Sequence, residues 1–177
     1  MSHDELVARA ARWLRNTQGC GVVLTEFGSS SIEIPDAIGW ATGGRFSTLV
    51  ECKTSRSDFY ADKKKPGRVG ITASHGIGRY RYYMTPPGVL SVDLVREHRP
   101  KWGLLEVKPR TIRTLLKAEQ FPLETAWREL PLLYSYARRI EQFGLPLDLA
   151  QLAVQREADS RARKAGVEVI EVKPCAR

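Results

Sequence analysis

The segments IEIPDAIGW, residues 32–40, and FSTLVECK, residues 46–53, form the apolar centre of the N-terminal half. Their β-branched and aromatic content predicts two strands joined by a tight glycine turn in a short meander. Side chains alternate between the faces of a strand, so Glu51 and Lys53 are expected to point the same way, with Cα atoms roughly 7 Å apart. Pro35 predicts an edge or a bulge in the first strand, because it has no amide donor.

A carboxylate lies within the first of these segments. Asp36 shares a predicted strand face with Ile34 and Ile38, and a carboxylate among core-facing aliphatic side chains is unfavourable unless it is paired or binds a metal. If the two strands pair, Asp36 and Glu51 converge. Two converging carboxylates suit Mg²⁺, which prefers oxygen ligands, lowers the pKa of a bound water and neutralises phosphate charge. The Lys53 ammonium can orient that water or stabilise charge on the phosphate, so Asp36, Glu51 and Lys53 are candidate catalytic residues.

The remaining N-terminal elements follow from periodicity and turn signals. A helix over residues 3–16 is predicted by an apolar stripe that begins at Leu6 and by a capping box formed by Ser2 and Glu5. Strands are expected at 21–27, 79–84, 89–95 and 102–107, a helix from Ser55 or Ser57 to about Lys65, and a glycine-rich loop at 66–78.

From Thr111 onward the pattern is mostly helical. Apolar residues recur at helical spacing, a last helix is expected at about 147–164, and a strand or tail follows at 167–173. The sequence therefore predicts an α/β fold, with a core over residues 1–108 and a helical C-terminal extension over 109–177 packed on the same domain. We expect the Leu and Tyr stripe over 130–140 to be core or a dimer surface.

The composition is that of a globular protein with an excess of cations. The 177 residues carry 28 Lys and Arg against 20 Asp and Glu, a formal net charge of +8. Such an excess favours a polyanionic partner through phosphate contacts and counterion release. The sequence has three cysteines, Cys20, Cys52 and Cys175, and no two of them have CxxC spacing. An odd number of cysteines without such a pair argues against a zinc site or a disulfide framework. No signal peptide and no membrane-spanning segment are expected, so the predicted compartment is the reducing cytoplasm.

The segments Ile34-Pro35-Asp36 and Val50-Glu51-Cys52-Lys53 together resemble the motif of the PD-(D/E)xK nuclease superfamily. The resemblance covers roughly residues 1–107 and implies a restriction-endonuclease-like αβββαβ core with a mixed central sheet. It also implies a deoxyribonuclease activity that depends on Mg²⁺, for which Mn²⁺ can substitute. In this superfamily the backbone carbonyl at the variable position, here Cys52, often helps to hold the metal. The segment 51–63, ECKTSRSDFYADK, also resembles the segment after the active-site strand of MmcB-like DNA-repair proteins.

Many members of this superfamily carry another acid, on the first helix or on the first strand. Glu5 is one candidate, although the capping box already accounts for it. Glu26 is the better candidate as an additional metal ligand, because it shares a predicted strand face with Val22 and Leu24. The alternative for Glu26 is a strand-end carboxylate turned toward solvent.

The stretch from Lys53 to Tyr83 is strongly basic, and tyrosines are interleaved with its cations. This pattern suits a phosphate track with base stacking. The candidate nucleic-acid contacts are Arg56, Lys63, Lys64, Arg79 and Arg81. For the two arginines at 79 and 81, the alternative is that they face water while the tyrosines pack on helices. Asp58 and Asp62 lie four apart on one helix face and are expected in local ion pairs with the lysines that follow, not as metal ligands.

Alternatives to a nuclease stay open at this point. One is a non-catalytic nucleic-acid-binding adaptor with a nuclease-like fold. For the motif itself, the alternative is that Glu51 and Lys53 form an ordinary ion pair on a half-exposed strand. Another is a protein whose basic surface binds an acidic protein. DNA is the expected partner, no membrane is expected, and association as a homodimer or with a partner protein is undecided by the sequence.

Overall fold

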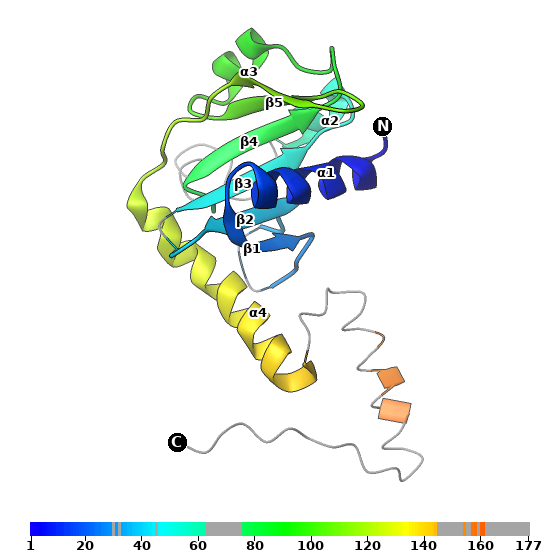
Figure 1. Ribbon diagram of the computed structural model, residues 1–177, viewed down its shortest axis with the longest axis vertical. Helices are drawn as coiled ribbons and strands as arrows, with labels where there is room; N and C mark the ends of the chain where they lie inside the picture. Colours follow the sequence, from blue (N-terminus) through cyan, green and yellow to red (C-terminus); the bar gives the residue numbers. More distant parts are fainter. Residues whose placement is uncertain are drawn as a thin grey trace.

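The computed structural model describes residues 1–29, 31, 33–44, 46–62 and 76–144, together with Val154, Glu157, Ala158, Ser160 and Arg161. Its centre is a six-stranded mixed sheet with the strand order β1-β2-β3-β4-β5-β6 (Figure 1). The strands are β1 (Cys20–Thr25), β2 (Ala37–Ala41), β3 (Ser47–Cys52), β4 (Tyr80–Thr85), β5 (Gly103–Val107) and β6 (Ile112–Leu116). Strands β3, β4 and β5 run parallel, and the other neighbouring pairs are antiparallel.

Four helices and a 3₁₀ segment complete the described part of the chain. They are α1 (His3–Asn16), α2 (Arg56–Ala61), α3 (Val92–His98), the 3₁₀ segment η3 (Leu123–Glu129) and α4 (Leu130–Phe143). The first six elements, α1-β1-β2-β3-α2-β4, have the expected αβββαβ order. The predicted α/β class with a mixed sheet is therefore confirmed.

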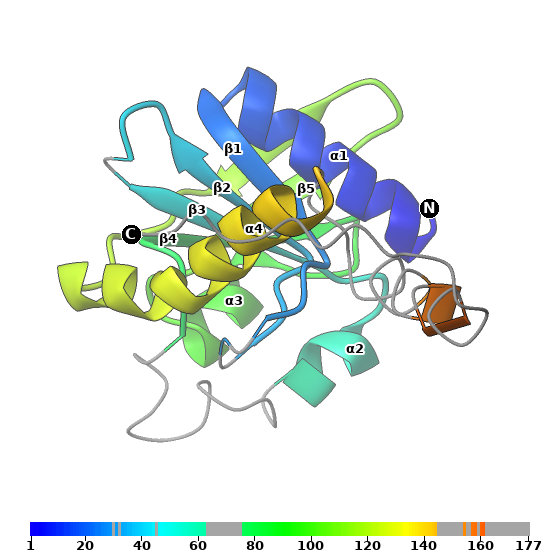
Figure 2. The ribbon, with the colours of Figure 1, turned by 90° about the horizontal axis from the view of Figure 1, so that it is seen from below.

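The sheet separates two apolar clusters. Helix α1 covers one face through Leu6, Ala10 and Trp13, whereas α2 and α3 lie on the opposite side (Figure 2). The predicted capping box is present, since the Ser2 hydroxyl accepts from the Glu5 amide and the Glu5 carboxylate accepts from the Ser2 amide. All six residues of β3 are buried, because β2 and β4 flank this strand and helices cover both of its faces. A charged side chain on β3 therefore lies inside the molecule.

The C-terminal part differs from the helical expectation at its start. Residues 112–116 form β6, which pairs with β5, so the predicted boundary after residue 108 falls inside a β-hairpin. The strand expected at 89–95 is wrong, since residues 92–98 form α3, whose first turn is capped by the Ser91 hydroxyl through the Leu94 amide. The expected segments 66–75 and 167–173 and most of 147–164 lie outside the described residues.

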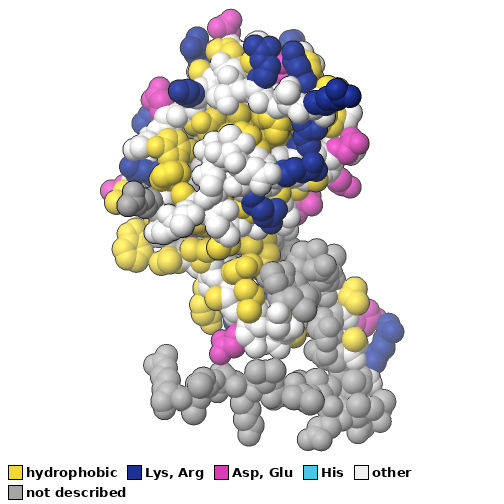
Figure 3. All heavy atoms as spheres, viewed as in Figure 1, with side chains coloured by type: hydrophobic (Ala, Val, Ile, Leu, Met, Phe, Trp, Pro, Cys, Tyr) yellow, Lys and Arg dark blue, Asp and Glu magenta, His cyan; other side chains and the backbone are white. Residues whose placement is uncertain are grey.

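Buried polar contacts attach η3 and α4 to the sheet. The Glu129 carboxylate accepts from Trp40 Nε1 at 2.8 Å, from the Ser47 hydroxyl at 2.5 Å and from the Gly78 amide at 2.9 Å. Leu132 packs in the same cluster as Trp40, which lies on the face opposite α1. The stripe over 130–140 is therefore partly core, through Leu132. Its other side exposes Leu130, Tyr134 and Ile140. Apolar side chains are visible on the surface of the α4 region (Figure 3).

Candidate active site at the end of β3

Glu51 and Lys53 lie on the same face of the sheet, as their spacing predicted. The Lys53 ammonium is 3.5 Å from Glu51 Oε2, and the Lys53 side chain is only 4% exposed. The neighbouring residues Val50 and Cys52 point to the opposite face, into the cluster under α1. The two charged side chains thus form a buried ion pair on the α2 side, not an ion pair on a half-exposed strand.

Asp36 lies directly before β2 and next to the end of β3. The β2–β3 register pairs Ala37 with Val50, so Asp36 comes opposite Glu51 when that register is continued by one residue. Asp36 Oδ2 accepts a hydrogen bond of 2.6 Å from the Cys52 amide. The predicted strand over 32–40 is wrong in its first half, because β2 begins only at Ala37 and Ile34 is 48% exposed. Asp36 is therefore positioned by the Cys52 amide, and not by a strand face shared with Ile34 and Ile38.

The electrostatics of Asp36 reflect a second negative charge nearby. Burial, followed by the charge of Glu51, raises the pKa of Asp36 to about 6, although the Cys52 amide, Lys53 and His3 all act to lower it. The carboxylates of Asp36 and Glu51 therefore repel each other in the folded protein. Such a pair is a candidate site for a cation, which would relieve the repulsion.

Lys53 is surrounded by carboxylates from two elements. Besides Glu51, its ammonium lies 3.3 Å from Asp62 Oδ1 and 3.7 Å from Asp58 Oδ1. Both acids come from the α2 region, where the Ser55 hydroxyl caps the helix through the Asp58 amide. Asp62 is buried against Lys53, whereas the lysines expected to pair with it lie outside the described residues. Its participation in the cluster was missed by sequence reasoning.

Strand β4 holds Asp62 from the other side. Tyr83, which the parallel register places next to Glu51, donates its hydroxyl hydrogen to Asp62 Oδ2 at 2.9 Å. The same hydroxyl accepts from Arg99 Nε at 3.1 Å, and the Tyr83 ring stacks on Trp102 with a centroid distance of 4.5 Å. These contacts fix the position of Asp62, and through it that of the Lys53 ammonium.

Glu26 lies at the solvent side of this cluster. It follows the end of β1 with a positive φ of 45°, and its side chain is 56% exposed. His3 lies between the two acids, with Nε2 at 3.4 Å from Glu26 Oε1 and 3.8 Å from Asp36 Oδ1. The exposure of the Glu26 side chain agrees with the alternative expectation, a strand-end carboxylate turned to solvent. Sequence reasoning missed His3, which gave no signal beyond its place at the start of a helix.

The carboxylates of Asp36 and Glu51 suit a divalent cation that keeps most of its waters better than a cation whose ligands all come from the protein. Among the described residues, no three His, Cys, Asp or Glu side chains form a cluster that could hold a metal ion. The pair Asp36 and Glu51 nevertheless suits Mg²⁺, which keeps several waters and is often held by one or two carboxylates. Burial raises the pKa of the Cys52 thiol, which therefore stays protonated and is no thiolate ligand. Only the backbone carbonyl of Cys52 could contribute there.

The candidate nucleic-acid contacts from the basic stretch separate into different environments. Arg81 is 1% exposed, donates to the carbonyls of Gly76 and Gly78, and lies 3.8 Å above the Phe121 ring. The prediction for Arg81 is therefore wrong, because its guanidinium is enclosed in the core. Arg79 is half-buried and donates a hydrogen bond to the Gln120 side chain. Arg56 is exposed and donates a hydrogen bond to the Val89 carbonyl. Lys63 and Lys64 lie outside the described residues.

Replacement of Asp36 by Asn is expected to stabilise the metal-free protein. The folded-state pKa of Asp36 lies above the value of 3.8 for a free carboxyl, so the wild type loses stability as the pH rises from about 4 to about 6. Asn removes this loss and keeps an oxygen acceptor for the Cys52 amide. We expect a gain of about 1–3 kcal/mol in the free energy of unfolding at pH 8 and almost none at pH 4, measured by urea denaturation in EDTA. Equal stability of wild type and variant at pH 8 would contradict this electrostatic account, and Asp93→Asn, an exposed acid on α3, is the matched control.

The fold and this cluster define an α/β protein with a buried carboxylate–lysine site at the carboxyl end of a central strand. No family model matches the chain, and no curated protein matches it significantly. Among solved structures, a protein of unknown function from Silicibacter pomeroyi (SPO1766) is similar to this chain with a TM-score of 0.57 and 22% sequence identity, over 97% of this chain and 99% of the other. This similarity concerns the fold alone. Within the described residues, no helix has both the length and the apolar character needed to cross a membrane.

Proposed function

We propose that this chain is a Mg²⁺-dependent nuclease that hydrolyses phosphodiester bonds of DNA. The observation that carries the proposal is the meeting of Asp36, Glu51 and Lys53 at the adjacent ends of β2 and β3, where burial, followed by the charge of Glu51, raises the pKa of Asp36. Outside a metal or catalytic site, such a buried like-charge pair only destabilises the fold. The excess of cations, +8 over the whole sequence, supports a polyanionic substrate.

Each residue has a chemical task in this proposal. Asp36 and Glu51 would hold the metal, with the Cys52 carbonyl and with Glu26 on the solvent side. Bound Mg²⁺ would supply a water of lowered pKa and neutralise phosphate charge. Asp62 and Tyr83 position the Lys53 ammonium, which would stabilise negative charge that develops on a phosphate at the site. We propose DNA repair in the cytoplasm as the setting, with DNA as the main partner.

One observation favours the alternative, a non-catalytic nucleic-acid-binding adaptor. The Lys53 ammonium is nearly buried and lies within 4.0 Å of three carboxylates, from Glu51, Asp58 and Asp62. An ammonium that is already paired stabilises an incoming phosphate less than an unpaired one. In the nuclease, Glu51 would hold the metal, so its negative charge would be shared between the metal and Lys53.

Cleavage of labelled DNA decides between the two functions. Single-stranded, double-stranded and branched DNA are incubated with the protein and Mg²⁺ or Mn²⁺, with EDTA as control. A nuclease is expected to cleave at least one substrate with metal and none in EDTA, and Asp36→Asn is expected to lose this activity although it is the more stable protein. Binding of DNA in EDTA, with no cleavage of any substrate under any condition, would leave only the adaptor. Asp93→Asn, an exposed acid on α3, is the matched control and is expected to cleave like the wild type.

A further inference from the structure

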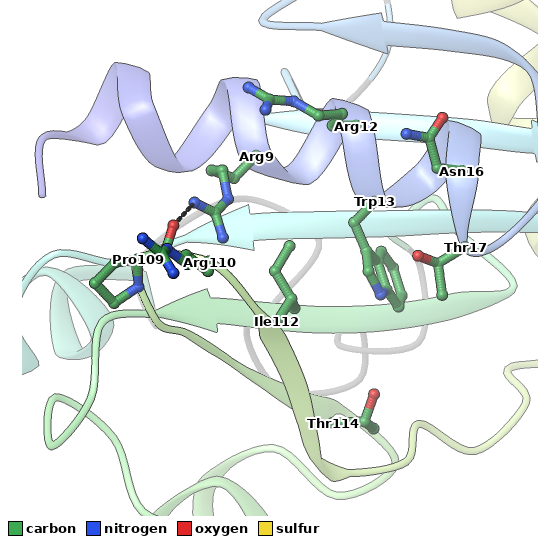
Figure 4. A pocket seen from close by; sticks show the side chains of 9 residues that line it. All are labelled: Arg9, Arg12, Trp13, Asn16, Thr17, Pro109, Arg110, Ile112 and Thr114. Atoms are coloured by element: carbon green, nitrogen blue, oxygen red, sulfur yellow. Dashed lines mark hydrogen bonds between the residues drawn. The ribbon is translucent and has the colours of Figure 1, made fainter.

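A basic groove lies between α1 and the β5–β6 hairpin, on the face of the sheet opposite α2. It has a volume of about 520 Å³, and its cationic lining consists of Arg9, Arg12 and Arg110. Trp13 forms part of its floor, and Thr114 on β6 lines it from the hairpin side (Figure 4). The nine residues that line the groove include no acid. The chemistry of this surface is therefore that of an anion site.

The fold holds the Arg9 guanidinium across the groove without neutralising it. Arg9 Nη1 donates to the Pro109 carbonyl at 2.8 Å (Figure 4). Arg9 Nη2 donates to the Lys108 carbonyl at 2.9 Å. Backbone carbonyls orient a guanidinium but leave its full charge in place, because Arg stays protonated at all relevant pH values. Among the described residues, no carboxylate forms an ion pair with Arg9, Arg12 or Arg110. The groove thus carries three cationic side chains without carboxylate partners.

The candidate active site and the Pro109 side of the groove lie at the same end of the sheet, and α1 contributes residues to both. Lys53 follows β3 and Pro109 follows β5, and because these strands run parallel both residues lie at the same end of the sheet. His3, in the first turn of α1, contacts Asp36. Arg12 is nine residues further along the helix, roughly 14 Å along its axis, so the groove and the Asp36–Glu51 site are separate places along a bound strand. Lys and Arg side chains gather over α1 and the nearby hairpin (Figure 3).

We infer that this groove binds the phosphate backbone of a nucleic-acid strand, away from the bond at the Asp36–Glu51 site. The inference rests on the proposed nucleic-acid substrate but not on its hydrolysis. Guanidinium groups bind phosphate oxygens through paired hydrogen bonds, and a row of cations without carboxylate partners suits a repeating anion. The Trp13 ring is only 5% exposed and makes an edge contact with Tyr82, so little of its surface is open to base stacking and the groove recognises backbone and not base sequence.

The test measures binding in EDTA, where metal-dependent hydrolysis cannot occur. A fluorescein-labelled 20-nucleotide single strand is titrated with wild type and with Arg12→Gln/Arg110→Gln, both exposed side chains. The double variant is expected to bind at least tenfold more weakly at low salt, and the slope of log K against log salt is expected to fall by about 1.4. The control Arg96→Gln/Arg138→Gln, which changes the net charge equally on α3 and α4, is expected to bind like the wild type.

Three outcomes would overturn the inference: unchanged binding by the groove variant, an equal loss in the control variant, or binding of a mononucleotide as tight as that of the 20-mer. The last would indicate a nucleotide pocket and not a strand-binding surface. Failure of the groove inference can be told apart from failure of the proposed nuclease activity. If the wild type never cleaves DNA, but the Arg12 and Arg110 substitutions still weaken its binding to the strand, the groove inference holds and the nuclease proposal fails. If the groove variant binds the strand as tightly as the wild type and still cleaves it, the groove inference is wrong and the assignment of the active site is unaffected.

Discussion

Replacing Glu51 by Gln is expected to lower metal-dependent DNA cleavage by at least about 100-fold, because it removes one of the two carboxylates that would hold the cation and polarise the attacking water. Gln keeps the size of the side chain and fills the same fully buried position on β3. The loss should appear in single-turnover cleavage at saturating protein, where weaker DNA binding does not contribute. Glu97→Gln, an exposed acid on α3, serves as the control for the change in net charge.

The same variant separates lost chemistry from lost structure. In Glu51→Gln, Lys53 keeps two carboxylates close by, from Asp58 and Asp62. Asp36 loses its like-charged neighbour, so its pKa is expected to fall toward the ordinary range. The fold should therefore persist, with an unfolding midpoint in urea close to that of the wild type. Wild-type cleavage by Glu51→Gln would contradict the assignment of Glu51 as a metal ligand.

The sequence predicted the first helix and the strand β3 well because their signals are local. The capping box of Ser2 and Glu5 lies within one helical turn, and the alternation of Glu51 with Lys53 follows from strand geometry alone. The element 112–116 was mistaken for helix, since Leu115 and Leu116 fit a helical spacing and only pairing with β5 makes this segment a strand. A contact between distant segments leaves no trace in local periodicity.

The site shows the same limit at the level of side chains. Asp36, Glu51 and Lys53 could be found from a motif. Tyr83 belongs to the cluster because β4 pairs in parallel with β3, and Asp62 because the end of α2 lies beside Lys53. Their sequence signals were ordinary: an acid at the end of a short helix and an aromatic residue in a strand. Arg81 shows the reverse, since a basic strand residue next to tyrosines suggested a surface but lies in the core.

Replacing Lys53 by Met is expected to destabilise the protein by about 3–5 kcal/mol, because removal of one partner leaves buried carboxylates without their cation. The Lys53 ammonium lies within 4.0 Å of three carboxylates, and two of these, on Glu51 and Asp62, are on fully buried side chains. Lys53 also lowers the pKa of Asp36, so the variant should lose more stability at pH 8 than at pH 5. Urea denaturation at the two pH values checks the size and the sign of the effect. A loss below about 1 kcal/mol at pH 8 would show that the cluster is solvated and not buried.

A second substitution shows whether the loss comes from unpaired charge. Lys53→Met/Asp62→Asn removes one of the carboxylates left behind, and Asn keeps an oxygen acceptor for the Tyr83 hydroxyl. The double variant should therefore be more stable than Lys53→Met alone, whereas two independent losses would add. Its cleavage activity then tests what Lys53 contributes to the reaction. A stable double variant that cleaves no DNA would assign Lys53 a role in the chemistry beyond its ion pairs. A stable double variant that cleaves like the wild type would assign Lys53 to the fold and leave catalysis to Asp36 and Glu51.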